Sequence, residues 1–448
     1  MLYFVVPRNM ANSVLLLASL FFYGYGEPKM LLVMVATIIF SWALGLKIPE
    51  KKWLTTVSVV VSLGVLVWFK YMGFFVESFS DAFGVEVKFM NIALPAGISF
   101  YTFQTLSYTI DLGRGRIHPQ KSLLDFAMYV ALFPQLIAGP IVVYSDVENQ
   151  LDARLRKTTW DGAYEGIHRF CIGLGKKVIL ANNLALFVQD FQALAEDQRS
   201  VAMYWAYAVA FSMQIYFDFS GYSDMAIGLG KIFGFTFPEN FNYPFIAKNI
   251  SEFWRRWHMT LGGWFREYVY IPLGGNRHDH QRNIMVVWFL TGMWHGASWN
   301  FILWGLYYAV LLMWEKSTLL NTFKKMPKPV SFVVSHAYTL FITVFGFAIF
   351  YFDKNLLKNL GYLFGFGCTG LTDIFTNSVI FDNIILLAVA LFFSVPVIPT
   401  LWNKLKERGA IPYTAERILK TVVFAAFVTL ASIRLVGNSY SAFLYFRF

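Results

Sequence analysis

The chain carries repeated apolar segments of the length that crosses a lipid bilayer. A transmembrane helix needs about 20 residues, and segments that approach or exceed this length recur along the whole 448-residue chain. They cover approximately residues 9–26, 29–46, 53–79, 94–112, 123–142, 162–188, 200–234, 283–315, 330–352, 383–402 and 418–436. We therefore predict an all-α polytopic membrane protein with about 11 transmembrane helices.

Composition and charge agree with this class and exclude an ordinary soluble enzyme. Hydrophobic residues make up 57% of the chain and charged residues 14%, whereas soluble domains carry about 25% charged residues. The net charge of +10 is attributed to basic loops on the cytoplasmic face rather than to nucleic-acid binding. The first apolar segment lacks a small-residue cleavage site, which indicates a retained span. With no repeat or soluble domain visible, we expect one membrane-embedded domain over residues 1–448.

Residues 283–315 pose a length problem. Basic residues flank both ends of this segment, so both ends are expected in the cytoplasm; these residues are Arg277, Arg282, Lys316, Lys324, Lys325 and Lys328. As one helix the segment would be about 50 Å long, against a hydrocarbon core of about 30 Å. We predict a re-entrant pair of half-spans with its apex near Gly292–Gly296, one strongly tilted helix being the alternative. Residues 123–142, broken by Pro134 and Pro140, invite the same interpretation.

His295 is the ionisable residue that stands out within residues 283–315. An ionisable group at membrane depth is costly unless it faces a cavity or a partner. A neutral histidine hydrogen-bonded between helices would explain it structurally. Its neighbours favour a ligand site, because Gly296 and Ser298 are small while Trp294 and Trp299 are large aromatic residues.

A second cluster runs from Ser251 to His258 and continues to Tyr268. Its tryptophans and arginines are typical of an amphipathic helix at the membrane interface. They are equally suited to a phosphate-bearing ligand, because arginine binds phosphate through two parallel hydrogen bonds. His258 lies four residues after Trp254 and, on a helix, would share its face. This spacing favours an inward-facing role for His258.

Other polar residues are expected to be structural. Asp218 and Asp224 lie in a long apolar segment, where we expect each to be hydrogen-bonded to serine, tyrosine or arginine at a helix break near Gly221. Asn300 is assigned a structural or secondary role. Residues 173–177 lack the spacing of a P-loop and residues 221–225 lack the second glycine of a nucleophile elbow. His278-Asp-His280 is interpreted as a polar connection, so no metal site is predicted.

Several motifs together resemble the membrane-bound O-acyltransferase family, and within it the bacterial alginate O-acetylation branch more than the D-alanylation branch. These motifs are 132–140, 215–228, 238–244, 251–258, 270–277, 294–299 and the C-terminal 435–446. Apart from the last, they lie in a core of about residues 95–315. The resemblance implies a ring of helices, with interfacial and re-entrant helices, around a central funnel that is open to both faces.

The resemblance also implies a reaction and site residues. His295 would be the catalytic histidine and His258 its second histidine. We expect His295 to act as general base when a hydroxyl attacks an acetyl thioester, an acyl-histidine being the alternative. His258 would orient the acyl group or help to hold the thioester. The donor-binding residues are expected to be Arg255, Arg256, Arg266, Trp294 and Trp257.

The same resemblance implies partners. The donor substrate is acetyl-coenzyme A or an acyl carrier protein thioester, and no bound cofactor is expected. The acetyl group would pass to an extracytoplasmic SGNH-type acetyltransferase and then to a polysaccharide. The protein would lie in the cytoplasmic membrane of a bacterium, with the lipid bilayer and no nucleic acid as a partner. D-alanyl transfer to teichoic acid is the nearest alternative, and a membrane transporter is the alternative from another class.

Overall fold

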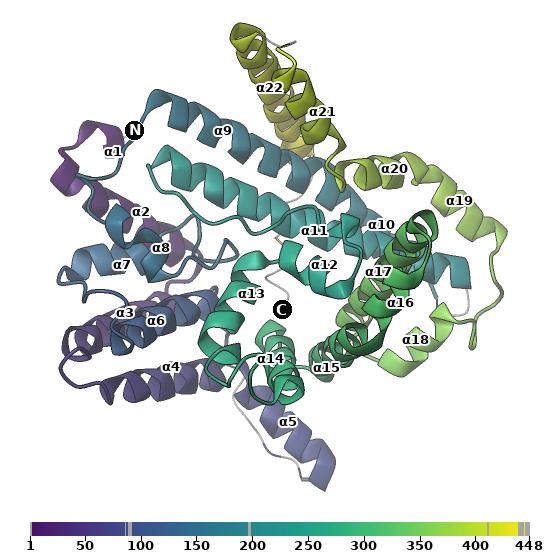
Figure 1. The fold of residues 1–448 in the computed structure, drawn as a ribbon, viewed down its shortest axis with the longest axis horizontal. Helices are drawn as coiled ribbons and strands as arrows, with labels where there is room; N and C mark the ends of the chain where they lie inside the picture. The colour runs from purple at the N-terminus through teal and green to yellow at the C-terminus, as the bar shows by residue number, and fades with distance from the viewer. Residues whose placement is uncertain are drawn as a thin grey trace. The chain divides into compact units, whose positions relative to one another are not determined.

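In the computed structural model all regular secondary structure among the described residues is helical (Figure 1), and these residues are 2–85, 87, 92–195, 199–409, 412–437 and 443. No strand is present among these residues, so the predicted all-α class is confirmed. The chain divides into two compact units. Unit 1 comprises 1–169, 226–239 and 263–269, and unit 2 comprises 170–225, 240–262 and 270–448. The single domain expected over residues 1–448 stays a prediction.

Unit 1 is built around α6, a helix that is buried along almost its whole length. It packs against α3, α4 and α7. The helices of this unit are α1 (Leu2–Val5), α2 (Ala11–Gly26), α3 (Met30–Lys47), α4 (Leu54–Lys70), α5 (Met72–Phe83), α6 (Ile98–Gly113), α7 (Leu123–Ala131), α8 (Tyr144–Val147) and the start of α9 (Trp160–Gly175), with short 3-10 turns at Arg8–Met10 and Glu148–Gln150.

Unit 2 holds a large aromatic core, to which α10, α11, α12, α15, α17 and α18 contribute. Its elements are the rest of α9, η3 (Lys176–Ala181), α10 (Asn182–Ala193), α11 (Val201–Ile232, which ends in unit 1), η5 (Pro244–Ile246), α12 (Ile250–Arg256), α13 (Met259–Phe265, also shared), α14 (His280–His295), α15 (Trp299–Trp314), η7 (Glu315–Leu319), α16 (Leu320–Lys325), α17 (Lys328–Tyr351), α18 (Leu356–Leu363), α19 (Ile374–Asp382), α20 (Ile384–Phe393), α21 (Val397–Glu407) and α22 (Tyr413–Gly437). The remaining element, η6 (Arg266–Tyr270), links the units.

Three of the described helices are long and apolar enough to cross a membrane. They are α3, the continuous helix 160–193 formed by α9, η3 and α10, and α17. Two bent helix pairs, α4 with α5 and α19 with α20, meet the same criterion as pairs. Most other predicted spans form helices that are shorter than their apolar segments, so the count of about 11 is not confirmed and stays a prediction.

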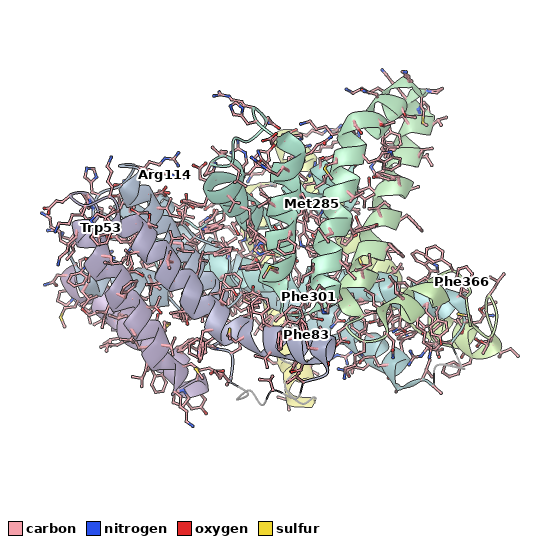
Figure 2. All side chains as sticks on the ribbon, turned by 90° about the horizontal axis from the view of Figure 1, so that it is seen from below. Trp53, Phe83, Arg114, Met285, Phe301 and Phe366 are labelled. Atoms are coloured by element: carbon pink, nitrogen blue, oxygen red, sulfur yellow. The ribbon has the colours of Figure 1, made fainter. Side chains whose placement is uncertain are left out.

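Residues 283–315 form two helices rather than one. α14 and α15 have 16 residues each, about 24 Å at about 1.5 Å per residue, and they meet at Gly296–Ser298. Gly292 faces Phe301 and Gly305, and Trp288 faces Gly305, a pairing that makes the two helices antiparallel. Figure 2 labels Met285 on α14 and Phe301 near the turn. The break is confirmed, while entry and exit at one membrane face stay a prediction.

The other predicted irregularities have mixed outcomes. α7 ends at Ala131, and the chain from there to Val143 is non-helical, as the prolines predict. This irregular backbone is largely buried, and the Tyr129 hydroxyl donates to the Val142 carbonyl at 2.9 Å. The helix break expected at Gly221 is wrong, because α11 continues from Val201 to Ile232.

The reason for the unbroken helix is a close crossing. A Cβ added at Gly221 would lie 2.8 Å from the Gly173 carbonyl oxygen, and one added at Gly173 would lie 2.4 Å from the Gly221 carbonyl oxygen. Glycine is therefore needed here for the approach of α9 to α11 rather than for a turn.

Candidate active site

His295 is the last residue of α14, immediately before the turn to α15. Its side chain is half-buried. The imidazole meets the rings of Trp304 and Phe350 nearly at right angles, with centroid distances of 5.0 and 5.1 Å. A Cβ at Gly296 would lie 2.3 Å from the Phe301 ring. The small residue after His295 therefore allows the aromatic side chains to close around the turn.

Asn300 braces this aromatic surround. Its Nδ2 donates to the Phe350 carbonyl oxygen at 2.7 Å, which ties the start of α15 to the end of α17. Phe350 in turn packs on His295. This placement agrees with the structural or secondary role expected for Asn300, which stays a proposal.

His258 lies between α12 and α13 rather than within a helix. α12 ends at Arg256, and His258 has a left-handed backbone with φ of 44°. The prediction that His258 shares a helical face with Trp254 is therefore wrong. The side chain is nonetheless inward-facing, with 2% of its surface exposed. The left-handed conformation turns the chain at His258, and histidine is among the residues that tolerate it.

The surroundings of the His258 ring are aromatic apart from one amide. Phe219 meets the ring edge-on at 4.7 Å and Trp294 lies at 5.7 Å between centroids. Nδ1 is 3.0 Å from the Asn240 Oδ1. Burial lowers the pKa of the imidazole to about 3, so His258 is neutral at physiological pH. Trp294 also contacts His295, at 5.0 Å, and thus links the two histidines.

The two tryptophans expected to bind the donor have different surroundings. Trp294, 3% exposed, adjoins both histidines and remains next to the candidate chemistry. Trp257 packs among Phe241, Phe245, Phe253 and Phe347. It is a component of the aromatic core, and we do not propose it as a donor contact.

The three arginines also differ. The Arg256 guanidinium pairs with Glu252 at 2.9 Å and donates to the Asn242 carbonyl at 3.1 Å, so internal partners engage it. Arg255 and Arg266 are exposed and can meet a ligand from solvent. Arg255 belongs to unit 2 and Arg266 to unit 1, and each is therefore considered separately.

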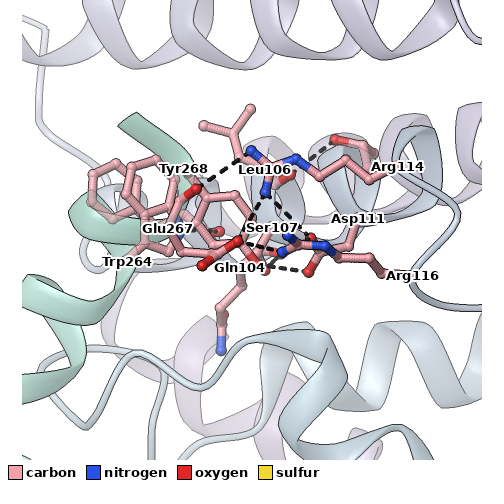
Figure 3. A network of polar contacts seen from close by, with 11 residues as sticks. Gln104, Leu106, Ser107, Asp111, Arg114, Arg116, Trp264, Glu267 and Tyr268 are labelled. Carbon is pink, nitrogen blue, oxygen red and sulfur yellow. Dashed lines mark hydrogen bonds and ion pairs between the residues drawn. The ribbon is translucent and has the colours of Figure 1, made fainter. Parts of the chain in front are cut away.

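A polar network anchors the segment that carries Arg266 (Figure 3). Glu267 pairs with Arg116 and, at 3.3 Å, with Arg114. The Tyr268 hydroxyl donates to Asp111 at 2.7 Å. These bonds connect η6 to the C-terminal end of α6, and the Arg266 side chain beside them is exposed to solvent.

Asp218 and Asp224 are paired with lysines. Lys177 lies 2.5 Å from Asp218, and both side chains are buried. Lys176 lies 2.7 Å from Asp224. The lysine partners were not among the serine, tyrosine and arginine partners expected from the sequence, and the structural role of both aspartates stays a prediction. Both pairs cross beside the Gly173–Gly221 contact and hold α11 against the continuous helix 160–193.

His280 has bonds at both ring nitrogens. The Lys316 ammonium, which can only donate, lies 2.9 Å from Nε2. Nδ1 lies 2.5 Å from the Tyr270 hydroxyl. His280 therefore takes part in a polar connection between η6, α14 and η7.

Asn240 and Glu315 are two further residues of the site region that were not predicted from the sequence. Glu315 is fully buried, and its carboxylate accepts hydrogen bonds from the Ile250 and Ser251 backbone nitrogens at 2.6 and 3.0 Å and from the Ser251 hydroxyl at 2.9 Å. An acid directly at the end of the apolar residues 283–315 was the available signal. For Asn240 the signal was its place in the motif 238–244.

The C-terminal motif 435–446 lies mostly outside the described residues. The structure follows the backbone of α22 to Gly437 and describes Phe443. Phe443 meets the Tyr222 ring at 4.9 Å and lies under the Lys177 ammonium at 4.5 Å. Phe443 therefore lies beside α11 and Lys177.

Known proteins are similar to this chain in sequence, two of the following three along its full length. Residues 116–352 match the model of the membrane-bound O-acyltransferase family. A probable alginate O-acetylase of Azotobacter vinelandii is 36% identical, with 100% of this chain and 96% of the relative covered. A peptidoglycan O-acetyltransferase of Helicobacter pylori is 32% identical, with 100% and 94% covered. A teichoic acid D-alanyltransferase of Bacillus subtilis is 32% identical, with 58% and 69% covered. The chain therefore belongs to the membrane-bound O-acyltransferase family and is a multi-pass membrane acyltransferase.

Proposed function

We propose that the protein transfers an acetyl group from a thioester donor for the O-acetylation of an extracytoplasmic polysaccharide, with His295 as the general base. The observation that carries this proposal is the position of His295, partly exposed at the α14–α15 turn between the rings of Trp304 and Phe350. A general base must be accessible to the substrate and held in a fixed orientation. The partial exposure of His295 provides the access, and the contacts with Trp304 and Phe350 restrict the orientation of its ring.

In the proposed step His295 takes the proton of an acceptor hydroxyl while the hydroxyl oxygen attacks the thioester carbonyl carbon. The C–O bond forms, the C–S bond breaks, and the thiolate leaves with the proton returned by the imidazolium. The negative end of the α14 dipole stabilises the transient positive charge on His295. A transient acyl-histidine is the alternative for the same residue.

Acetyl-coenzyme A is the proposed donor, and an acyl carrier protein thioester is the alternative. Both carry phosphate, which the exposed Arg255 or Arg266 can bind through two hydrogen bonds. Trp294, which adjoins both histidines, is the proposed wall of the acyl site. The Asp–Lys pairs and Asn300 are proposed to support the surrounding helices.

Relatives favour acetyl over D-alanyl transfer. Both the probable alginate O-acetylase and the peptidoglycan O-acetyltransferase align with all of this chain, whereas the teichoic acid D-alanyltransferase aligns with 58% of it. We further propose that the protein lies in a bacterial cytoplasmic membrane and passes the acetyl group to an SGNH-type acetyltransferase outside it.

The test is an acyl-transfer assay with the protein in nanodiscs and radiolabelled acetyl-coenzyme A. His295→Ala is expected to abolish thioester consumption while the protein folds normally. His118→Ala is the matched control, because the His118 side chain is 96% exposed, and it should behave like the unaltered protein. Transfer by His295→Ala at the control rate would eliminate the base assignment. Uptake of a solute without acyl transfer, even with carrier protein and SGNH partner added, would favour a transporter.

A further inference from the structure

The orientation of the Asn240 amide is fixed by its neighbours. Asn240 is fully buried, and its Oδ1 lies 2.9 Å from the Thr260 hydroxyl and 3.4 Å from the Thr260 backbone nitrogen. A backbone N–H can only donate, so the amide oxygen must face Thr260. The other end of the amide, Nδ2, donates to the Ser223 hydroxyl at 3.0 Å.

The amide orientation determines the tautomer of His258. Nδ1 lies 3.0 Å from the same Asn240 oxygen, and two acceptors cannot share a hydrogen bond without a hydrogen. Nδ1 therefore carries the hydrogen. In the neutral ring Nε2 is then a bare acceptor.

The backbone holds this arrangement in place. The Met259 nitrogen donates to the Asn240 carbonyl and the Asn242 nitrogen donates to the Arg256 carbonyl, both at 2.9 Å. The loop 240–242 is thus pinned across the α12–α13 junction. His258, with its left-handed backbone, has its ring directed at Asn240 by this junction.

Nε2 is the unusual atom. It is buried and has no hydrogen-bond partner within the part of the chain that the structure describes. Buried polar atoms nearly always have partners, so an exception needs an explanation. Phe219 and Trp294 pack against the His258 ring, and Trp294 also contacts His295 in the candidate active site. A substrate group that carries a hydrogen would satisfy Nε2.

We propose that Asn240 is a positioning residue that holds His258 with its hydrogen on Nδ1, so that Nε2 accepts a hydrogen bond from an N–H or O–H group of a bound substrate. This inference rests on the proposed acyl transfer and gives His258 a defined part in it. Such a ring cannot donate to the thioester carbonyl oxygen. It can hold an amide N–H of the pantetheine arm, which both candidate donors carry, or the acceptor hydroxyl.

The first test compares Asn240→Ala and Asn240→Asp in the transfer assay, with Asn149→Asp as the control at an exposed position. Asn240→Ala removes the acceptor of Nδ1–H and should lower kcat/KM about tenfold to a hundredfold, the effect of losing one buried hydrogen bond. A rise in KM for the donor would identify the amide as the group held, and a rise in KM for the acceptor would identify the hydroxyl.

Asn240→Asp provides a readout that a merely structural role would not change. The carboxylate still accepts from Nδ1–H, but it favours the imidazolium and should raise the pKa of His258. Of the described residues that contact the ring, Asn240, Phe219 and Trp294 are not titratable. His295, which contacts Trp294, is titratable, but it is present in the control as well, so its titration appears in both profiles. Transfer by Asn240→Asp should approach that of the control at high pH and fall as the pH is lowered, with a new limb absent from the control. If Asn240→Ala fails to fold, this pH profile decides the question.

Two results would overturn the inference. One is an Asn240→Asp profile that parallels the control. The other comes from ¹⁵N NMR of histidine-labelled protein, with His258 assigned from the spectrum of His258→Ala. The expected spectrum has a protonated Nδ1 and a bare Nε2, and a hydrogen on Nε2 would contradict the proposal. Because the NMR experiment needs no turnover, it tests Asn240 even where the proposed acetyl transfer fails.

Discussion

Replacing Glu315 by alanine should loosen the helix that leads to His258. The backbone N–H groups at the start of an α-helix have no partner within it, and at the first three positions of α12 side chains accept from them. Ile250 and Ser251 donate to Glu315, and Glu252 donates to the Asn249 side chain at 2.7 Å. Phe253 then makes the first regular helical bond, to the Asn249 carbonyl at 3.0 Å. Glu315 thus accepts from two of these three N–H groups, although it lies more than sixty residues away in the sequence.

The size of the destabilisation follows from the N–H groups that have no acceptor in the alanine variant. Two buried N–H groups would lose their acceptor, at about 1–3 kcal/mol each. Removing the buried carboxylate also removes its desolvation penalty, which offsets a part of that loss. We expect a net destabilisation of about 2–4 kcal/mol. Ser251→Ala loses only the hydroxyl bond and should destabilise by about 1 kcal/mol. Glu315→Gln keeps one acceptor oxygen and should fall between these two variants.

The assay has a global and a local readout. Thermal unfolding in detergent, followed by tryptophan fluorescence, should rank stability as Ser251→Ala, then Glu315→Gln, then Glu315→Ala. Hydrogen exchange should speed up at the amides of Ile250 and Ser251 in both Glu315 variants. Unchanged exchange at these two amides in Glu315→Ala would refute the reasoning, whatever the thermal midpoint.

Three further predictions concern other parts of the molecule. Asp218→Leu and Lys177→Met alone should each destabilise by about 3–5 kcal/mol, because a buried charge loses its partner, while the double variant should be nearly neutral in thermal unfolding. Gly292→Ala should abolish well-folded expression, since its Cβ would lie 2.4 Å from a carbonyl oxygen of α15, whereas Gly64→Ala, with open space around it, should express normally. The free energy of unfolding should decrease as the pH is lowered below about 6.5, because His258 binds a proton there in the unfolded chain but not in the folded chain, where its pKa is about 3. Equilibrium unfolding between pH 8 and pH 5 measures this decrease, and a free energy of unfolding that does not change over this range would contradict the prediction.

Charge and length predicted the α14–α15 break because both are local properties of the sequence. Basic residues on both sides of residues 283–315 demanded an even number of crossings, and a single helix would have been too long. The same reasoning located the irregular backbone after Ala131, where prolines remove helical hydrogen bonds. His295 was found in this way, since its place in an apolar segment is visible without any tertiary contact.

The Asp–Lys pairs could not be predicted, because their partners lie more than forty residues away. The local sequence tests residues 173–177 against a phosphate loop and Gly221 against a helix break or a nucleophile elbow, and neither comparison indicates a helix crossing. In the structure the two glycines and the ion pair belong together. Gly173 and Gly221 allow the two helices to approach closely, and at this distance Lys177 reaches Asp218. A glycine in an apolar segment predicts either a break or a close crossing, and the local sequence does not distinguish them.

For His258 the predicted direction was right and the reason was wrong. Helical spacing from Trp254 assumed that the helix continued, but α12 ends at Arg256. The residue is inward-facing because the turn at His258 is pinned by the loop 240–242. Spacing along the chain does not reveal Asn240, because it contacts His258 across the α12–α13 junction and lies 18 residues before it in sequence.

The contacts in unit 2 close a cycle that fixes the two histidines relative to each other. His295 ends α14, the glycine contacts hold α14 against α15, and Glu315 at the end of α15 caps α12. α12 then leads directly to His258, whose ring meets Trp294, the neighbour of His295. The links are packed helices, hydrogen bonds and ring contacts, and because close-packed interiors transmit strain, we expect a change in one link to alter the others. Glu315 variants should therefore lose acyl transfer as well as stability, although Glu315 touches neither histidine.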